Sequence, residues 1–151
     1  MQLVFLISSI TAAFFANFHS IQSLEEGTAV KTFSLTVTVK EVSDTSGMME
    51  FGLYNNAKVF TQVGKTFKKI RTRIDSDSVT VTFTGLPEGS YAVCIYHDAN
   101  NNDECDKNFF GVPTEGYGFS NNIRPTISVP AFSECSFYLK EDKHITISPI
   151  Y

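Results

Sequence analysis

The sequence repeats one pattern: apolar and polar residues alternate over short runs, and turn-forming residues separate the runs. In the clearest run, Phe33, Leu35, Val37 and Val39 are separated by serine and threonine residues. Because successive side chains of a β-strand point to opposite faces, this alternation predicts strands with one face in a core. Similar runs cover residues 49–53, 79–83, 127–129, 135–139 and 145–147, and we expect a short edge strand within 69–74.

Two other stretches complete the expected architecture. The run from Ser90 to His97 is apolar on both faces, which predicts a central strand covered on both sides. Phe60, Val63 and Phe67 recur at helical spacing, which indicates either a short helix or a loop covering a sandwich edge. The sequence thus predicts an all-β fold, an antiparallel, immunoglobulin-like β-sandwich of about seven strands with one long polar loop.

The amino-terminal segment is typical of a secretory signal peptide. Its first 23 residues contain no Asp, Glu, Lys or Arg and are mainly apolar from Leu3 to Phe18. We therefore expect a leader over residues 1–23, a single domain over 24–151, and a periplasmic or extracellular location. A buried strand or an uncleaved anchor are the alternatives. Residues 24–151 contain no stretch apolar enough to cross a membrane.

Charge and cysteine content narrow the classes of function. The formal net charge of −4 provides no broad basic surface for phosphates, which disfavours nucleic-acid binding. The basic residues between 65 and 73 are interpreted as a solvated face protecting an edge strand, with anionic lipid or glycan contact as the alternative. The three cysteines, Cys94, Cys105 and Cys135, allow at most one internal disulfide, and their spacing matches no zinc motif.

A tight turn precedes the central strand. In the sequence from Leu86 to Tyr91, Pro87 presets its own φ, and Gly89 is expected to take a positive φ. Tyr91 is expected to pin the turn through its hydroxyl. This Leu-Pro-x-Gly-x-Tyr arrangement resembles the turn of prealbumin-like sandwiches.

The central strand runs into an unusual polar stretch, which reads HDANNNDECDKNFFGVPTEGYGFSNN from His97 to Asn122. Together with the preceding turn, it resembles the bacterial family catalogued as domain of unknown function 2141. That family's pattern reads His-Asp-x-Asn-x-Asn-Gly, then Asp, then Gly-x-Pro-x-Glu-Gly-Tyr-Gly-Phe-Ser-Asn. The resemblance is close from about Gly85 to Asn122, and the alternating strands extend it over nearly all of the mature chain. It implies an exported β-sandwich with no established activity.

The beginning of this stretch has the spacing of a calcium loop. Asp98, Asn100, Asn102 and Asp106 occupy positions 1, 3, 5 and 9, and the backbone carbonyl of Glu104 falls at position 7. Residues 98–109 contain four acids and one lysine, a net charge of −3 that a cation would offset. These residues are the candidate calcium ligands, and calcium is the only cofactor that the sequence suggests.

Two positions depart from a calcium loop. Asp103 stands where a glycine is usual and must adopt a left-handed conformation, which aspartate tolerates. Phe109 stands where a bidentate glutamate is usual, and Glu115 is the nearest substitute. The alternative is a metal-free loop in which the same side chains cap their own backbone.

The second half of the stretch is rich in aromatic and amide side chains. One interpretation is a platform for a glycan or peptide, formed by the exposed rings and read by Asn121 and Asn122. The other is that the rings fold down and close the open end of the sandwich. The candidate ligand-contacting residues are Glu115, Tyr117, Phe119 and Asn121.

Catalysis is not expected. His97 beside Asp98, with Ser120 or Cys105 as nucleophile, could form a hydrolase triad, but no nucleophile elbow surrounds these residues. The sequence favours an exported, non-catalytic domain that binds an unidentified surface ligand or envelope protein. A structural scaffold with a self-capped loop and no ligand is the alternative.

Overall fold

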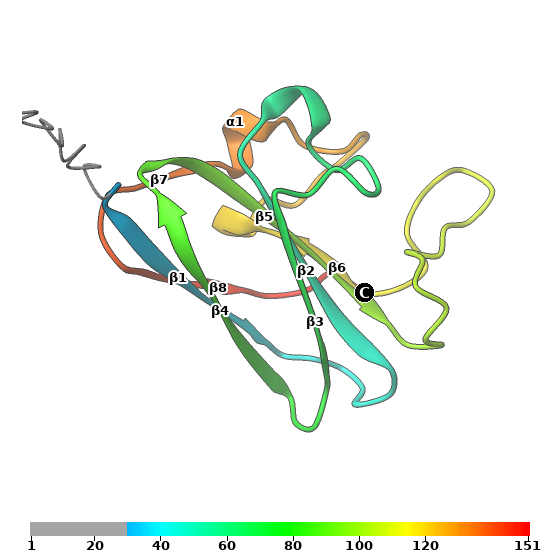
Figure 1. The fold of residues 1–151 in the computed structure, drawn as a ribbon. Helices are drawn as coiled ribbons and strands as arrows, with labels where there is room; N and C mark the ends of the chain where they lie inside the picture. Colours follow the sequence, from blue (N-terminus) through cyan, green and yellow to red (C-terminus); the bar gives the residue numbers. More distant parts are fainter. Residues whose placement is uncertain (1–29) are drawn as a thin grey trace, which may run out of the picture.

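The chain folds as a β-sandwich of two facing sheets, as the alternating runs predict (Figure 1). This computed structural model describes residues 30–151, so the expected leader lies outside the described residues. The strands are β1 (Thr32–Lys40), β2 (Met48–Tyr54), β3 (Lys68–Arg73), β4 (Ser78–Pro87), β5 (Gly89–Asp98), β6 (Tyr117–Phe119), β7 (Phe137–Leu139) and β8 (Lys143–Ile147). The helical turns are η1 (Ala57–Val59), η2 (Ser120–Asn122) and α1 (Phe132–Cys135).

One sheet has the strand order β4-β1-β8, and the other has the order β3-β2-β5-β6. Strand β7 also pairs with β5 and so belongs to the second sheet. Strands β1 and β8 are parallel, and all other pairs are antiparallel. Strand β5 is central, as predicted: β2 runs along one edge, while β7 pairs with its beginning and β6 with the part near its end. This arrangement leaves the last residues of β5 and the loop after them at one end of the sandwich (Figure 1).

The main core lies between the sheets and follows the sequence alternation. Leu35, Val37 and Val39 of β1 are completely buried, as are Phe51 and Leu53 of β2. Burying each such side chain stabilises the fold by about 1.5–3 kcal/mol relative to exposure.

A second, smaller core covers the outer face of β5. Phe60 is its centre: its ring packs edge-on against Tyr54 and Phe132, at centroid distances of 5.4 and 5.6 Å. Ala92 of β5 and Cys135 of α1 are completely buried in the same cluster. The residues after Phe60 form a loop rather than a helix, and only Phe60 of the three helically spaced residues is buried, since Val63 is 96% exposed.

Three expectations about local structure are wrong. Residues 127–129 are not a strand, since Ile127 is 99% exposed and Pro130 removes a backbone donor directly after them. Cys135 ends α1, and the expected strand starts only at Phe137. Strand β6 lies within a stretch that carries almost no strand signal, because three residues are too few to show an alternation.

The turn before β5 is confirmed in one respect and corrected in another. The Tyr91 hydroxyl donates to the carbonyl of Pro87 at 2.8 Å, so the tyrosine pins the turn as expected. The positive φ occurs at Gly85, with φ 65°, and not at Gly89. The reason is a bulge inside β4: its register with β1 shifts between Phe83 and Leu86, and Gly85 lies at that shift.

Candidate binding loop

The loop that follows β5 is anchored by a buried carboxylate. Asp98, the last residue of β5, has no exposed surface. Its Oδ1 accepts from the backbone N–H of Asn102 at 3.0 Å, and its Oδ2 accepts from the N–H of Asp103 at 2.9 Å. Two backbone donors of the loop are therefore satisfied by one side chain that the sheet holds in place.

Arg71 of the edge strand β3 provides the counter-charge. Its Nη2 atom donates to Oδ2 of Asp98 at 2.5 Å and to Oδ1 of Asn101 at 2.8 Å, and its Nη1 atom forms an ion pair with Asp103. The interpretation of residues 65–73 as a purely solvated face is thus incomplete. Sequence reasoning missed this role, because it depends on the pairing of β3 with β2 beside β5.

The amides predicted as metal ligands converge on Asp106. Nδ2 of Asn100 donates to its carboxylate at 2.7 Å, and Nδ2 of Asn102 does so at 3.2 Å. The side-chain oxygens of Asn100 and Asn102 accept from the backbone N–H groups two residues on, at 3.1 and 2.9 Å. The structure therefore brings Asp98, Asn100, Asn102 and Asp106 into one hydrogen-bonded loop with the features of consecutive Asx-turns.

Asp103 stands at one position where the sequence departs from a calcium loop, and Glu115 is the nearest substitute at the other. Asp103 has a φ of 67°, the left-handed conformation expected of it. The carboxylate of Glu115 accepts from the N–H of Ala99 at 3.0 Å and from the N–H of Asp106 at 3.1 Å. Glu115 thus connects the two sides of the loop base.

The loop tip presents two phenylalanine rings to solvent. Phe109 is 97% exposed and Phe110 is 85% exposed, and the rings stack edge-on at 5.5 Å. The turn beneath them is closed by Asn108, whose N–H donates to the carbonyl of Val112 at 2.8 Å. The Asn108 side chain also accepts from the N–H groups of Phe110 and Val112, at 3.0 and 3.1 Å. The exposed rings therefore lie on a hydrogen-bonded turn.

The other aromatic and amide residues are packed into the body of the protein. Phe119 is 8% exposed, and Tyr117 pairs through its backbone with Ile150 near the end of the chain. The amide of Asn121 donates to the carbonyls of Glu134 and Ser136, at 3.0 and 3.1 Å. The rings of this second half fold into the body of the protein, as one interpretation expects, whereas Phe109 and Phe110 stay exposed; a binding platform stays a prediction. Direct ligand contact by Glu115, Tyr117, Phe119 and Asn121 stays a prediction.

The residues of the conceivable hydrolase triad are used structurally. The two ring nitrogens of His97 lie 2.8 Å from the carbonyl oxygen of Ser46 and 3.3 Å from the hydroxyl of Tyr151. Ser120 is buried: its hydroxyl accepts from the N–H of Val93 at 2.9 Å and donates to the carbonyl of Cys135 at 2.6 Å. The described hydrogen bonds contain no contact between the imidazole and either Asp98 or Ser120.

The oxygen-rich loop only partly fits a calcium ion. The side chains that could bind the ion converge, but the amide groups of Asn100 and Asn102 point their nitrogens at Asp106. The carboxylate oxygens of Asp98 already accept three hydrogen bonds. A bound cation would require the amides to turn and would lie near the Arg71 guanidinium. Within residues 30–151, no group of three or more His, Cys, Asp or Glu side chains is arranged to hold a metal. The calcium site stays a prediction.

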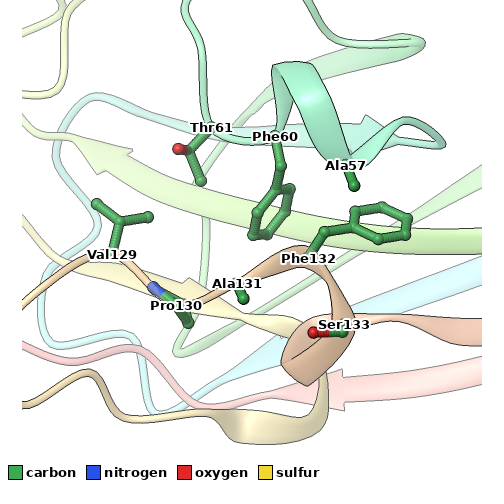
Figure 2. Close-up of a pocket in the computed structure, with 8 residues that line it drawn as sticks. All are labelled: Ala57, Phe60, Thr61, Val129, Pro130, Ala131, Phe132 and Ser133. Carbon is green, nitrogen blue, oxygen red and sulfur yellow. The ribbon is translucent and has the colours of Figure 1, made fainter.

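A shallow cleft of about 430 Å³ lies elsewhere, between η1 and the segment that leads into α1 (Figure 2). Phe60 and Phe132 project into it, and Val129 and Pro130 border it. None of the candidate metal-ligating or ligand-contacting residues predicted from the sequence lines this cleft.

Comparison with models of protein families gives a match to the chain. A family model described as "Uncharacterized protein conserved in bacteria (DUF2141)" matches residues 37–148. The chain belongs to the DUF2141 family. The DUF2141 match begins within β1 and ends just after β8, so it covers both sheets and the whole polar loop. The family resemblance seen in the sequence is therefore confirmed.

Other comparisons add no activity to the DUF2141 assignment. No curated protein and no solved structure shows significant similarity to the chain. In the part of the chain that the structure describes, no helix has the length and hydrophobicity needed to span a membrane.

Proposed function

We propose that this DUF2141 protein is an exported, non-catalytic binding domain whose contact surface is the tip of the loop after β5. Its partner would be a ligand or protein of the cell envelope that offers an apolar surface to Phe109 and Phe110. The observation that carries the proposal is the exposure of both stacked rings on a hydrogen-bonded turn.

The fold gains almost no burial energy from these rings. A phenylalanine side chain stabilises a protein mainly by burial, about 1.5–3 kcal/mol for full burial, and these two rings are almost fully in water. Aromatic side chains also dominate the energetics of many protein interfaces. Because hydrogen bonds already hold the turn, binding would cost the loop little conformational entropy.

The non-catalytic part of the proposal is supported by the hydrogen bonds of the polar residues. The His97 ring is held by Ser46 and Tyr151, and the Ser120 hydroxyl is consumed by backbone groups. A hydrolase based on His97 and Asp98 would require these contacts to break. Turnover of ester or peptide substrates that is abolished by His97→Ala would contradict the non-catalytic proposal.

Site-specific photo-crosslinking tests the binding surface directly. A photoreactive phenylalanine analogue at Phe110 is compared with the same analogue at Ile127, which is 99% exposed and outside the loop. The chain is produced with its leader in bacterial cells. We expect a discrete adduct only from the Phe110 position. The same adduct pattern from both positions would show that the loop has no partner of its own and would favour the scaffold alternative.

Export is tested in the same cells. Fractionation and amino-terminal sequencing of the recovered protein should give a periplasmic or extracellular product that lacks the leader. A cytoplasmic product that still begins at Met1 would contradict export, whatever the crosslinking shows.

A second candidate function is calcium binding by the loop. It is favoured by the convergence of Asn100 and Asn102 on Asp106 and by the left-handed conformation of Asp103. An extracellular site of this kind is expected to have a Kd on the order of 0.1–1 mM, and saturation at 100 times Kd would add about 2.7 kcal/mol.

The calcium test is a melting experiment from zero to 10 mM calcium, with magnesium as the control ion. The Asp98→Ala/Asp106→Ala variant serves as the site knockout, and Asp75→Ala/Asp77→Ala serves as a matched acid-removal control. A rise in Tm with calcium in the control variant but not in the knockout supports the site. An unchanged Tm in all proteins means that the loop is self-capped and free of metal.

A further inference from the structure

We infer that Cys94 and Cys135 form the single internal disulfide of this protein, and that Cys105 remains a free thiol. The bond would staple α1 onto the outer face of the central strand. The pairing rests on which thiols the fold brings together.

The first observation is that both side chains belong to the same small core. Cys94 follows Ala92 on the outer face of β5 and packs against the cluster in which Cys135 is completely buried. Helix α1, which ends at Cys135, packs against β5. All three cysteines are free thiols in the structure, and Cys94 and Cys135 are the two that the fold places in one cluster on neighbouring elements.

The second observation is the backbone bridge beside the thiols. One atom, the hydroxyl oxygen of Ser120, accepts from the N–H of Val93 and donates to the carbonyl of Cys135. Val93 directly precedes Cys94. The Ser120 hydroxyl therefore links the backbone next to Cys94 to the backbone of Cys135.

The remaining cysteine lies in a different environment. Cys105 belongs to the polar loop, where burial raises its pKa and the charged groups Lys107, Glu115 and Asp106 act on it to a smaller extent. Cys94 lies four residues before the end of β5, about 13 Å along the strand from the point where the loop begins. A bond from Cys105 to either other cysteine would require the loop to leave its anchors at Asp98 and Glu115.

Burial of the thiols determines when the bond can form. Burial, with a smaller contribution from the nearby Cys135, raises the pKa of Cys94 well above its usual range, and burial raises the pKa of Cys135 to about 11. Because the thiolate is the attacking form, both groups react slowly once they are folded. We therefore expect oxidation to occur during folding, before the cluster closes.

The reaction needs an external oxidant, namely a low-molecular-weight or protein disulfide. One cysteine thiolate attacks that disulfide, giving a mixed disulfide and one released thiol. The second cysteine thiolate attacks the mixed disulfide, and the second thiol leaves. In total two cysteine thiols lose two protons and two electrons, and one oxidant disulfide is reduced to two thiols.

Refolding in a defined redox buffer tests the pairing. The denatured, reduced chain is refolded with oxidised and reduced glutathione, the remaining thiols are alkylated, and a non-reducing digest is analysed by mass spectrometry. We expect a Cys94–Cys135 linkage and an alkylated Cys105. The Cys105→Ser variant should give the same linkage. Alkylation of all three cysteines, or any linkage that includes Cys105, would overturn the inference.

Thermal melting provides a second measurement. Reducing the oxidised protein should lower Tm on the order of 10 °C, because the bond closes a long loop of chain. The same reductant should leave the Tm of the Cys94→Ala/Cys135→Ala variant unchanged. An equal fall in both proteins would show that the reductant acts elsewhere.

In the cell the bond rests on the proposed export, because disulfides persist in oxidising compartments. Acid trapping of the thiols in growing cells separates the two proposals. A linkage that forms on refolding but is absent in cells contradicts export and leaves the pairing intact, whereas failure on refolding removes the pairing alone.

Discussion

The ion pair at the loop base gives a sharp test of how the loop is held. Replacing Arg71 by methionine retains much of the apolar stem and removes the charge that Asp98 contacts at 2.5 Å. Asp98 would keep its two backbone donors, so it would remain buried as a carboxylate without a counter-charge.

The structure sets the size of the effect. Breaking a fully buried pair by removing one partner costs about 3–5 kcal/mol. Here the Arg71 side chain is 17% exposed, and the two backbone donors still stabilise the carboxylate, so we expect a loss of about 2–4 kcal/mol. The ion pair with Asp103 contributes little to this value, because the Asp103 side chain is 77% exposed.

The assay is urea unfolding at pH 7 and 0.15 M salt, followed by far-UV circular dichroism. Arg73→Met is the matched control, since Arg73 lies two residues further along the same edge strand and is exposed. It should change the free energy of unfolding by less than about 0.5 kcal/mol. The Arg71→Met/Asp98→Asn double variant should lose less than the sum of the single variants, with a coupling of about 1–3 kcal/mol. Equal stability of Arg71→Met and Arg73→Met would refute the reasoning.

Three further predictions concern the support of the loop and of the second core. Gly47→Ala should lower the free energy of unfolding in urea by at least about 1 kcal/mol more than Gly64→Ala. Both residues have a positive φ, but only at Gly47 would a Cβ meet backbone, that of Asp98 and Ala99 at the end of β5. Ser120→Ala should lower the free energy of unfolding by about 1–3 kcal/mol in urea titrations, with exposed Ser133→Ala unchanged. Burial raises the pKa of Tyr54 to about 12. The stability that the neutral Tyr54 side chain contributes is therefore complete below pH 10 and is lost as the pH rises through 12. Between pH 9 and 11 the free energy of unfolding of the Tyr54→Phe variant should therefore fall by about 1 kcal/mol less than that of the parent. An identical dependence of the free energy of unfolding on pH in both proteins would count against this assignment.

The sequence carried enough information for the sandwich and for the shape of the loop. Alternation identified the faces of β1, β2 and β4, because a period of two leaves no choice about which residues share the core. The Asx spacing of Asn100 and Asn102 and the left-handed Asp103 were also predictable, because these conformations depend on side chains that bond to nearby backbone. Strand β6 and the exposed segment at Ile127 were missed or misassigned, because three or four residues are too few to define a period.

Contacts between residues distant in the sequence were decided only by the tertiary structure. Arg71 is 27 residues from Asp98, and nothing in either segment indicates that strand pairing brings them together. The same holds for the choice of Cys94 and Cys135 over Cys105, and for which aromatic rings are buried and which are exposed. Local patterns determine how each segment bends and which face is apolar, whereas the partners of a charge, a thiol or a ring depend on how the sheets are assembled.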